Sequence, residues 1–129
     1  MKLNVNEAGV LMIDLANKPG TLNEIATLLS EANINVLGIA GVGFGEEAKL
    51  GLYVEGDEKA HHDFLRQTVE VQLTKALVVS AEEDVPGVLQ EITSRLMAGE
   101  INIEFATGSM HGLVLITNDN DKAKEVLTN

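Results

Sequence analysis

The sequence predicts an α+β protein made of two similar units, each with an antiparallel sheet and two helices on one face of that sheet. Three observations support this fold class. Short apolar runs of strand length alternate with stretches in which apolar residues recur at helical spacing. These segments follow one another in the order strand, helix, strand, strand, helix. The same order occurs twice along the 129 residues, so the chain is predicted to contain an internal repeat.

The repeat is most visible at a Pro-Gly pair. Pro19-Gly20 recurs as Pro86-Gly87, an offset of 67 residues (86 − 19). At that offset identical residues align: Leu22 with Leu89, Ile25 with Ile92, Ile34 with Ile101, Asn35 with Asn102 and Gly41 with Gly108. Near the end of each copy Phe64-Leu65 aligns with Val126-Leu127, and the shorter offset places a deletion in the second hairpin. We therefore predict a first domain at residues 7–74 and a second at 75–129.

The elements of each copy follow from local pattern. Residues 10–13 are almost continuously apolar, as in an interior strand. Pro19 is well placed at a helix start, and apolar residues recur at helical spacing from 22 to 32. Asn33, and Gly99 in the second copy, are predicted to take the left-handed conformation at the helix ends. The remaining elements are strands at 35–41 and 49–54 around a glycine-rich loop at 41–45, helices at 58–68 and 121–128, and a strand at 69–73.

The second copy lacks a fourth strand. The first copy ends in residues 69–73, but no segment after 128 can take the same place. Subtracting the repeat offset aligns residues 2–6 with 69–73. We therefore hypothesise that residues 1–6 supply the missing strand, because the second sheet would otherwise expose an interior edge.

Two segments in each copy resemble an ACT domain. Asp14–Leu22, with its amide residue, one further position and Pro-Gly before a helix, resembles the start of that domain. Glu31–Val36 resembles the family's entry to the second strand, and residues 84–89 and 99–104 match in the second copy. The resemblance, to free-standing tandem ACT proteins, covers residues 8–129. It implies ferredoxin-like βαββαβ units that pair through their second strands into one eight-stranded sheet.

The resemblance also implies a function and a site. In amino-acid-sensing members, such as the serine-inhibited regulatory domain of phosphoglycerate dehydrogenase, the ligand lies between two ACT domains. An Asn before the Pro-Gly loop and an Asn at the start of the second strand hold it there. These positions are Asn17 and Asn35 here, with Asp84 and Asn102 in the second copy. A ligand-contacting histidine of that dehydrogenase falls at Leu15, which argues against serine as the ligand.

The chemistry of these positions suits a zwitterion. The helix start after Gly20 offers unpaired N–H groups for a carboxylate, and Asn side chains both donate and accept. Pseudo-symmetric pairing predicts two sites, Asn17 with Asn102 and Asp84 with Asn35. We favour the first, because Asp84 would repel the carboxylate. The predicted ligand-binding residues are Asn17, Pro19, Gly20, Thr21, Leu22, Asn35, Asp84, Gly87, Val88 and Asn102, with Leu15, Leu37, Ile39 and Phe105 as candidates for side-chain selection. The alternative is that these Asn and Asp residues serve only in turns and helix caps.

Composition argues against several other functions. The net charge is −11 and there are only three Phe and one Tyr, so neither nucleic acid nor an anionic membrane is an expected partner. There is no Cys, no run of membrane-spanning length and no signal peptide, which predicts a cytoplasmic protein without disulfides. His61 and His62 are adjacent and cannot chelate one ion from a helix, so no metal and no cofactor are expected. No catalytic constellation is visible, so the protein is not predicted to be an enzyme.

Two functions remain after these exclusions. The first is an amino-acid sensor that regulates an enzyme or regulator. The second is a ligand-free interaction module or regulatory subunit of a biosynthetic enzyme such as acetohydroxyacid synthase. In either case we predict a homodimer, because the strands are apolar on both sides and the helices cover only one face.

Overall fold

The computed structural model describes residues 1–129 and divides them into two compact units. One unit is Gly9–Thr74, and the other combines Met1–Ala8 with Lys75–Asn129. The elements are β1 (Leu3–Ala16), α1 (Thr21–Glu31), β2 (Val36–Phe44), β3 (Glu47–Val54), α2 (Glu58–Leu65), β4 (Glu70–Ala81), α3 (Val88–Ala98), β5 (Ile103–Ser109), β6 (Gly112–Thr117) and α4 (Asn120–Thr128). The predicted α+β class, with antiparallel strand pairs and helices, is confirmed.

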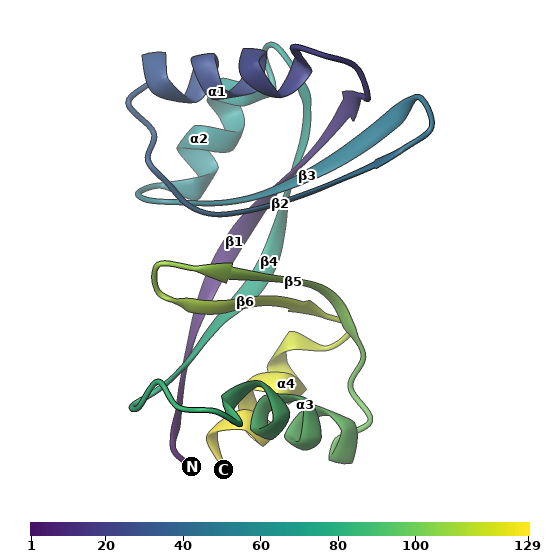
Figure 1. The fold of residues 1–129 in the computed structure, drawn as a ribbon. Helices are drawn as coiled ribbons and strands as arrows, with labels where there is room; N and C mark the ends of the chain where they lie inside the picture. Colours follow the sequence, from purple (N-terminus) through teal and green to yellow (C-terminus); the bar gives the residue numbers. More distant parts are fainter. The chain divides into compact units, whose positions relative to one another are not determined.

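In the Gly9–Thr74 unit, β3 is paired with β1 on one side and with β2 on the other. Leu52 of β3 lies opposite Leu11 in one ladder and opposite Ile39 in the other, which fixes the register. Helices α1 and α2 cover one face of these strands (Figure 1). Ile25 and Leu29 of α1 pack there on the helix-facing residues of the sheet, and this cluster is the core of the unit.

The second unit has the same arrangement of elements. β6 pairs with β4 and with β5, and α3 and α4 lie over one face (Figure 1). Leu3 is only 5% exposed and belongs to the same core cluster as Ile92, Leu96 and Leu127. Arg95 adds polar ties to the termini: its Nη1 donates to the Leu127 carbonyl at 2.7 Å and its Nη2 donates to the Met1 carbonyl. The N-terminal residues therefore share a core with residues from the C-terminal half of the chain.

The long strands β1 and β4 are each continuous across the boundary between the units. β1 has 14 residues and β4 has 12, whereas the sequence predicts shorter separate strands. The boundary falls between Ala8 and Gly9 in β1 and between Thr74 and Lys75 in β4. No turn-forming pair interrupts either segment, so nothing in the backbone forces a break. Each strand thus contributes one half to each unit.

The predicted hairpin between the strands at 35–41 and 49–54 is present, but its loop is shorter than the predicted 41–45. β2 continues to Phe44 and β3 begins at Glu47, so only Gly45 and Glu46 form the turn. Gly45 has a φ of 57°, which lies in the left-handed region that favours glycine. Gly43 is a strand residue, and a Cβ there would lie 2.7 Å from Nδ2 of Asn17. This glycine is needed for a close approach between strand and loop rather than for a turn.

The helix ends also differ from the prediction in the second copy. Asn33 has the expected left-handed φ of 57°, but Gly99 has a φ of −86°. The left-handed residue is Glu100, with a φ of 56°, and it aligns with Asn33 in the repeat. Gly99 is constrained by packing instead, because a Cβ there would lie 3.2 Å from Cγ1 of Val126.

Replacing Glu100 with Gly is therefore expected to stabilise the protein. A left-handed backbone costs a residue with a Cβ about 1 kcal/mol, and glycine removes that cost. Urea denaturation should show the free energy of unfolding rising by about 0.5–1 kcal/mol, since glycine also loses more chain entropy on folding. Glu100→Ala is the matched control, because it removes the same carboxylate but keeps the Cβ. Equal effects of the two changes would contradict the backbone explanation.

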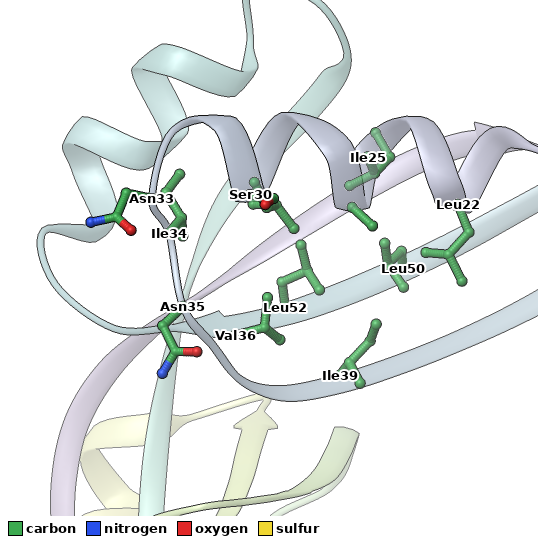
Figure 2. Close-up of a pocket in the computed structure, with 12 residues that line it drawn as sticks. Leu22, Ile25, Ser30, Asn33, Ile34, Asn35, Val36, Ile39, Leu50 and Leu52 are labelled. Atoms are coloured by element: carbon green, nitrogen blue, oxygen red, sulfur yellow. The ribbon is translucent and has the colours of Figure 1, made fainter.

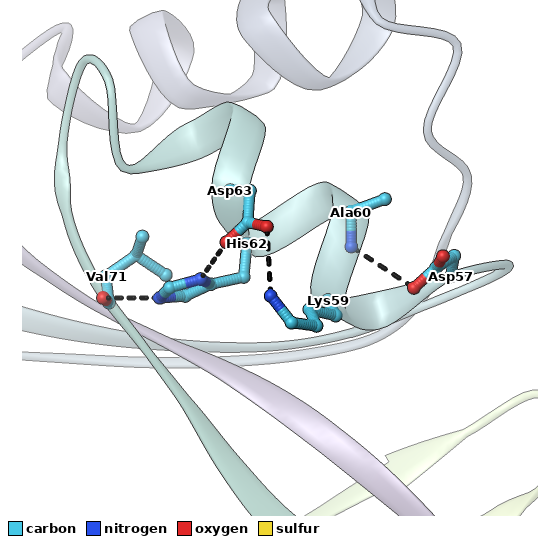
Figure 3. A network of polar contacts seen from close by, with 6 residues as sticks. All are labelled: Asp57, Lys59, Ala60, His62, Asp63 and Val71. Carbon is cyan, nitrogen blue, oxygen red and sulfur yellow. Dashed lines mark hydrogen bonds and ion pairs between the residues drawn. The ribbon is translucent and has the colours of Figure 1, made fainter.

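Helix α2 is fixed to β4 through a polar network (Figure 3). His62 places Nε2 3.2 Å from the Val71 carbonyl oxygen and Nδ1 3.1 Å from Oδ1 of Asp63. Lys59 donates to Oδ2 of Asp63 at 3.2 Å. The hydrogen bond from His62, and after it the one from Lys59, holds the pKa of Asp63 below its ordinary value. The carboxylate form is thus favoured in the folded protein.

This shift predicts one component of acid sensitivity. Because the pKa of Asp63 is lower in the folded than in the unfolded chain, its stabilising effect is present above the unfolded pKa of about 3.9. It is lost as the pH falls through the folded pKa. Melting temperatures of wild type and Asp63→Asn should therefore differ near neutral pH and converge once the pH is below the folded pKa of Asp63. Lys59→Ala should narrow the difference. A constant gap between wild type and Asp63→Asn at all pH values would contradict this role.

The sheet faces opposite the helices are exposed in part: on β2, Val42 is 49% and Phe44 72% exposed, whereas other residues on these faces are buried. Val10 and Val114 alternate with residues of the two cores and both have zero exposure. β2 and β5, the second strands of the two copies, do not pair with each other, because β2 pairs with β3 and β5 pairs with β6. The chain thus has a six-stranded order and not the implied eight-stranded sheet. No helix is long and apolar enough to cross a membrane.

Candidate functional site

The Pro-Gly loop connects β1 to α1 and leaves the start of that helix without a side-chain cap. Gly20 occupies the N-cap position with a φ of 93°, a conformation suited to glycine. The Thr21 hydroxyl does not cap the helix, because it donates to the Ala16 carbonyl at 2.8 Å. The Thr21 N–H donates to the Lys18 carbonyl at 3.4 Å, and the N–H groups of Leu22 and Asn23 have no acceptor from a capping side chain.

The uncapped start is specific to the two helices that follow Pro-Gly. Gly87 has a φ of 97° and also leaves α3 without a side-chain cap. In contrast, Asp57 accepts from Ala60 N at 3.2 Å to cap α2, and Asp119 accepts from Lys122 N at 3.0 Å to cap α4. Both Pro-Gly helices therefore retain the positive end of the helix dipole for an external anion.

Asn17 is held between the loop and the hairpin. Its Nδ2 donates to the Gly45 carbonyl at 2.9 Å, and its backbone N–H donates to the Glu46 carbonyl at 2.9 Å. Gly43 also lies close to the Asn17 side chain and restricts its position. Oδ1 makes no hydrogen bond within the chain. The side chain is thus oriented in advance, with its acceptor atom still available.

A groove runs beside α1 along β2. At the loop end it is a cavity of about 560 Å³, and further along α1 it continues as one of about 400 Å³ (Figure 2). The two cavities share the side chains of Leu22, Ile39 and Leu50. The loop-end cavity is lined by Leu15, Asn17, Lys18, Pro19, Gly20, Thr21, Leu22, Ile39, Gly41, Val42, Gly43, Ala48, Lys49 and Leu50. Five predicted residues, Asn17, Pro19, Gly20, Thr21 and Leu22, are therefore brought together.

Asn35 lies at the other end of the groove (Figure 2). The 11 residues of α1 separate it from the Pro-Gly loop, a length of about 16 Å at 1.5 Å per residue. Its Nδ2 donates to Oε2 of Glu55 at 3.1 Å. One small ligand bound in this unit cannot contact both Asn17 and Asn35.

The predicted residues of the second copy surround a cavity of different chemistry. It has a volume of about 620 Å³, and Asp84 and Val88 line it together with Glu83 and His111. Gly87 precedes Val88 as the helix N-cap. Asn102 is absent from this lining: its N–H donates to Oδ1 of Asn118 at 2.9 Å at the entry to β5. The two Pro-Gly loops therefore do not form equivalent sites.

Several groove residues were missed by sequence reasoning. Lys18 and Lys49 line the loop-end cavity, and Lys49 also pairs with Asp14 at 3.1 Å. Gly41 and Gly43 face the same side of β2, where they leave room beside the loop. Their spacing of two residues within an apolar run was the available signal. Of the candidates for side-chain selection, Leu15 and Ile39 line this cavity, whereas Leu37 and Phe105 do not.

The loop and the groove lie in a part of the chain that resembles a known protein family. Residues 9–58 match the family model of the ACT domain. This segment of the chain is similar to an ACT domain. The match spans β1 from Gly9, the Pro-Gly loop, α1, β2, β3 and the start of α2, and thus includes the whole groove beside α1. It does not extend to the second copy. A search of curated proteins found no match.

Solved structures resemble the chain over nearly its whole length. Protein BT0572 from Bacteroides thetaiotaomicron is 26% identical with a TM-score of 0.78, over 95% of this chain and 88% of that one. The regulatory subunit of aspartate kinase from Thermus thermophilus, in its ligand-free form, is 16% identical with a TM-score of 0.67, over 98% and 93%. Aspartokinase III from E. coli, in complex with aspartate and ADP, is 18% identical with a TM-score of 0.56, over 98% and 31%. The chain therefore shares its fold with these three structures.

Proposed function

We propose that this chain is a non-catalytic cytoplasmic regulatory protein that binds a free amino acid at the Pro-Gly loop of its ACT domain. The observation that carries the proposal is the uncapped start of α1 beside Asn17 in a cavity of about 560 Å³. The free N–H groups suit an α-carboxylate, and Oδ1 of Asn17 is an acceptor for an α-ammonium group. A small ligand with these contacts would bind with a Kd of roughly 1 μM to 1 mM.

We further propose that the site is completed by another ACT domain. β2 lies at one end of the strand order and carries exposed apolar side chains: Val42 is 49% exposed and Phe44 72%. Such a strand at the end of the order favours pairing with a second copy of the chain, which adds to the sheet-face argument for a homodimer. The unit of Met1–Ala8 with Lys75–Asn129 is proposed as a second ACT domain, since its Pro-Gly helix starts in the same way. Asn102 is the residue proposed to meet the ligand from such a neighbour.

A ligand-free interaction module is the second candidate function. It is favoured by one specific observation: Nδ2 of Asn17 is already used by Gly45. In that case the loop is structural and the chain acts as a regulatory subunit of an amino-acid biosynthetic enzyme, such as acetohydroxyacid synthase. The likeness to a separate regulatory subunit of aspartate kinase supports an enzyme partner in either case.

A thermal-shift screen of the twenty amino acids at millimolar concentration tests the proposal. A ligand at 100 times its Kd adds about 2.7 kcal/mol of stability, which raises the melting temperature by several degrees. Asn17→Ala should remove this shift. The matched control is Asn23→Ala, because Asn23 is an exposed amide of the same helix start that does not line the cavity. A flat screen in wild type would favour the interaction module, and co-purification with an enzyme would then identify its partner.

A further inference from the structure

The charges of the groove differ from those of the whole chain. The protein has 20 acidic and nine basic residues, yet neither cavity of the groove is lined by Asp or Glu. The only charged residues of the lining are Lys18 and Lys49. The cavity at the other Pro-Gly loop has the opposite charge, because Glu83 and Asp84 line it and no lysine does. A cationic ligand side chain would therefore find no carboxylate in the groove beside α1.

The shape of the groove gives a direction to the ligand. Its polar end is the loop, with Asn17, Lys18 and the free N–H groups of α1. From Leu22 onward the lining is mainly aliphatic, and the second cavity adds Ile25, Leu29, Val36 and Leu52 (Figure 2). A ligand with its α-carboxylate at the loop would extend its side chain over Leu22, Ile39 and Leu50. Burial of apolar surface there is favourable, whereas an unpaired ammonium group is costly.

We infer that the groove between α1 and β2 selects amino acids with an uncharged aliphatic side chain of about three or four carbons, and rejects lysine and arginine. This inference rests on the proposed function and adds the class of ligand. Gly41 is a position that determines how large a ligand side chain the groove accepts. It faces the groove from β2, and a Cβ there would lie 3.3 Å from Cδ1 of Leu50, so an added methyl group would crowd a side chain that lines both cavities.

Isothermal titration of the full chain with a homologous series tests the inference. Alanine, 2-aminobutyrate, norvaline and norleucine differ by one methylene each, and Kd should fall about fourfold per step, from about 0.8 kcal/mol per buried methylene. Lysine is the matched probe for charge, because it is norleucine with a terminal ammonium group. Norleucine should bind at least about tenfold more tightly than lysine.

Two variants locate the effect in the groove. Gly41→Ala should weaken norleucine binding more than alanine binding, because its methyl group crowds Leu50, which the longer ligand side chain covers. Leu22→Glu places a carboxylate where the two cavities meet, and glutamate is well tolerated in the first turn of a helix. It should reverse the preference, so that lysine binds more tightly than norleucine. Circular dichroism of both variants establishes that each remains folded.

The outcomes separate this inference from the proposed function. Binding that depends on Asn17 but is equal for alanine and norleucine, or tighter for lysine, would overturn the aliphatic selection alone. A complete absence of binding by all twenty amino acids would overturn both. If no ligand binds and Leu22→Glu turns a dimer into a monomer in sedimentation, a second copy of the chain occupies the groove, and the inference is wrong.

Discussion

Deletion of residues 1–6 should lower the stability of the unit formed by Met1–Ala8 and Lys75–Asn129 by more than about 4 kcal/mol. Leu3 is 5% exposed in the core of that unit, and Val5 packs against the same cluster. Truncation of one buried leucine to alanine alone costs about 2–5 kcal/mol. The deletion also removes strand pairing with β4 and the Met1 carbonyl that accepts from Arg95. An effect of this size is a large share of the 5–15 kcal/mol that stabilises a typical domain.

Two spectroscopic signals can separate the units in a urea titration. The single tyrosine, Tyr53, lies in the Gly9–Thr74 unit, so its fluorescence reports the unfolding of that unit. Far-ultraviolet circular dichroism reports on both. The truncated chain should lose part of its circular dichroism at low urea, before the tyrosine signal changes.

Point variants give the deletion its controls. Leu3→Ala should lower stability by about 2–4 kcal/mol. Lys2→Ala should have an effect below about 0.5 kcal/mol, because the Lys2–Glu82 ion pair at 3.4 Å is solvent-exposed. If the deletion variant unfolds at the same urea concentration as the full chain, the N-terminal strand is not part of this core.

The sequence was sufficient for the class of fold because its signals were redundant. Apolar spacing, the Pro-Gly pair and the internal offset all pointed to the same strand and helix order, and the repeated helix stripes Ile25–Leu29 and Ile92–Leu96 are buried as expected. The repeat offset also identified residues 2–6 as a strand, and β1 begins at Leu3. These are properties of local pattern, which one sequence carries in full.

The sequence was insufficient where the role of a glycine depends on a distant segment. Gly43 could be interpreted as a loop residue, because nothing local shows that Asn17, from another part of the chain, lies against it. Gly99 could be interpreted as a helix-end glycine, because its packing against Val126 of α4 is a tertiary contact. In both cases a missing Cβ serves close packing, which local propensity cannot distinguish from a need for positive φ.

The candidate site was predictable at its polar end but not along its length. Asn17 through Leu22 are contiguous in the sequence, so a motif could identify them together. Residues of β2 and β3 form the floor of the groove. The charge of the groove depends on the fold, because none of the 20 acidic residues lines the cavity at its loop end. Which charged residues line the groove is determined by the folded sheet and not by local sequence.

The contact between Gly43 and Asn17 should appear as a large energetic coupling. Gly43→Ala in the wild-type chain places a Cβ 2.7–2.9 Å from three atoms of the Asn17 side chain, closer than real Cβ contacts allow. The overpacking is expected to lower stability by about 1–3 kcal/mol. In the Asn17→Ala background the obstacle is gone, and alanine should match or exceed glycine in the strand by about 0.5 kcal/mol. The double-mutant cycle, measured by urea denaturation, should thus give a coupling of about 1–3 kcal/mol.

The same cycle distinguishes a rigid ligand site from a structural turn. Gly43→Ala displaces Asn17 without removing its amide, so it should weaken amino-acid binding if the orientation of Asn17 matters for the ligand. Gly108→Ala is the matched control, because a Cβ there meets nothing within 4 Å, and both stability and binding should stay within about 0.5 kcal/mol of wild type. A strong coupling with unchanged ligand binding would mean that Asn17 only joins the loop to the hairpin. The amino acid would then depend on the helix start and Lys18 alone, so Asn17→Ala would leave the ligand-induced shift intact.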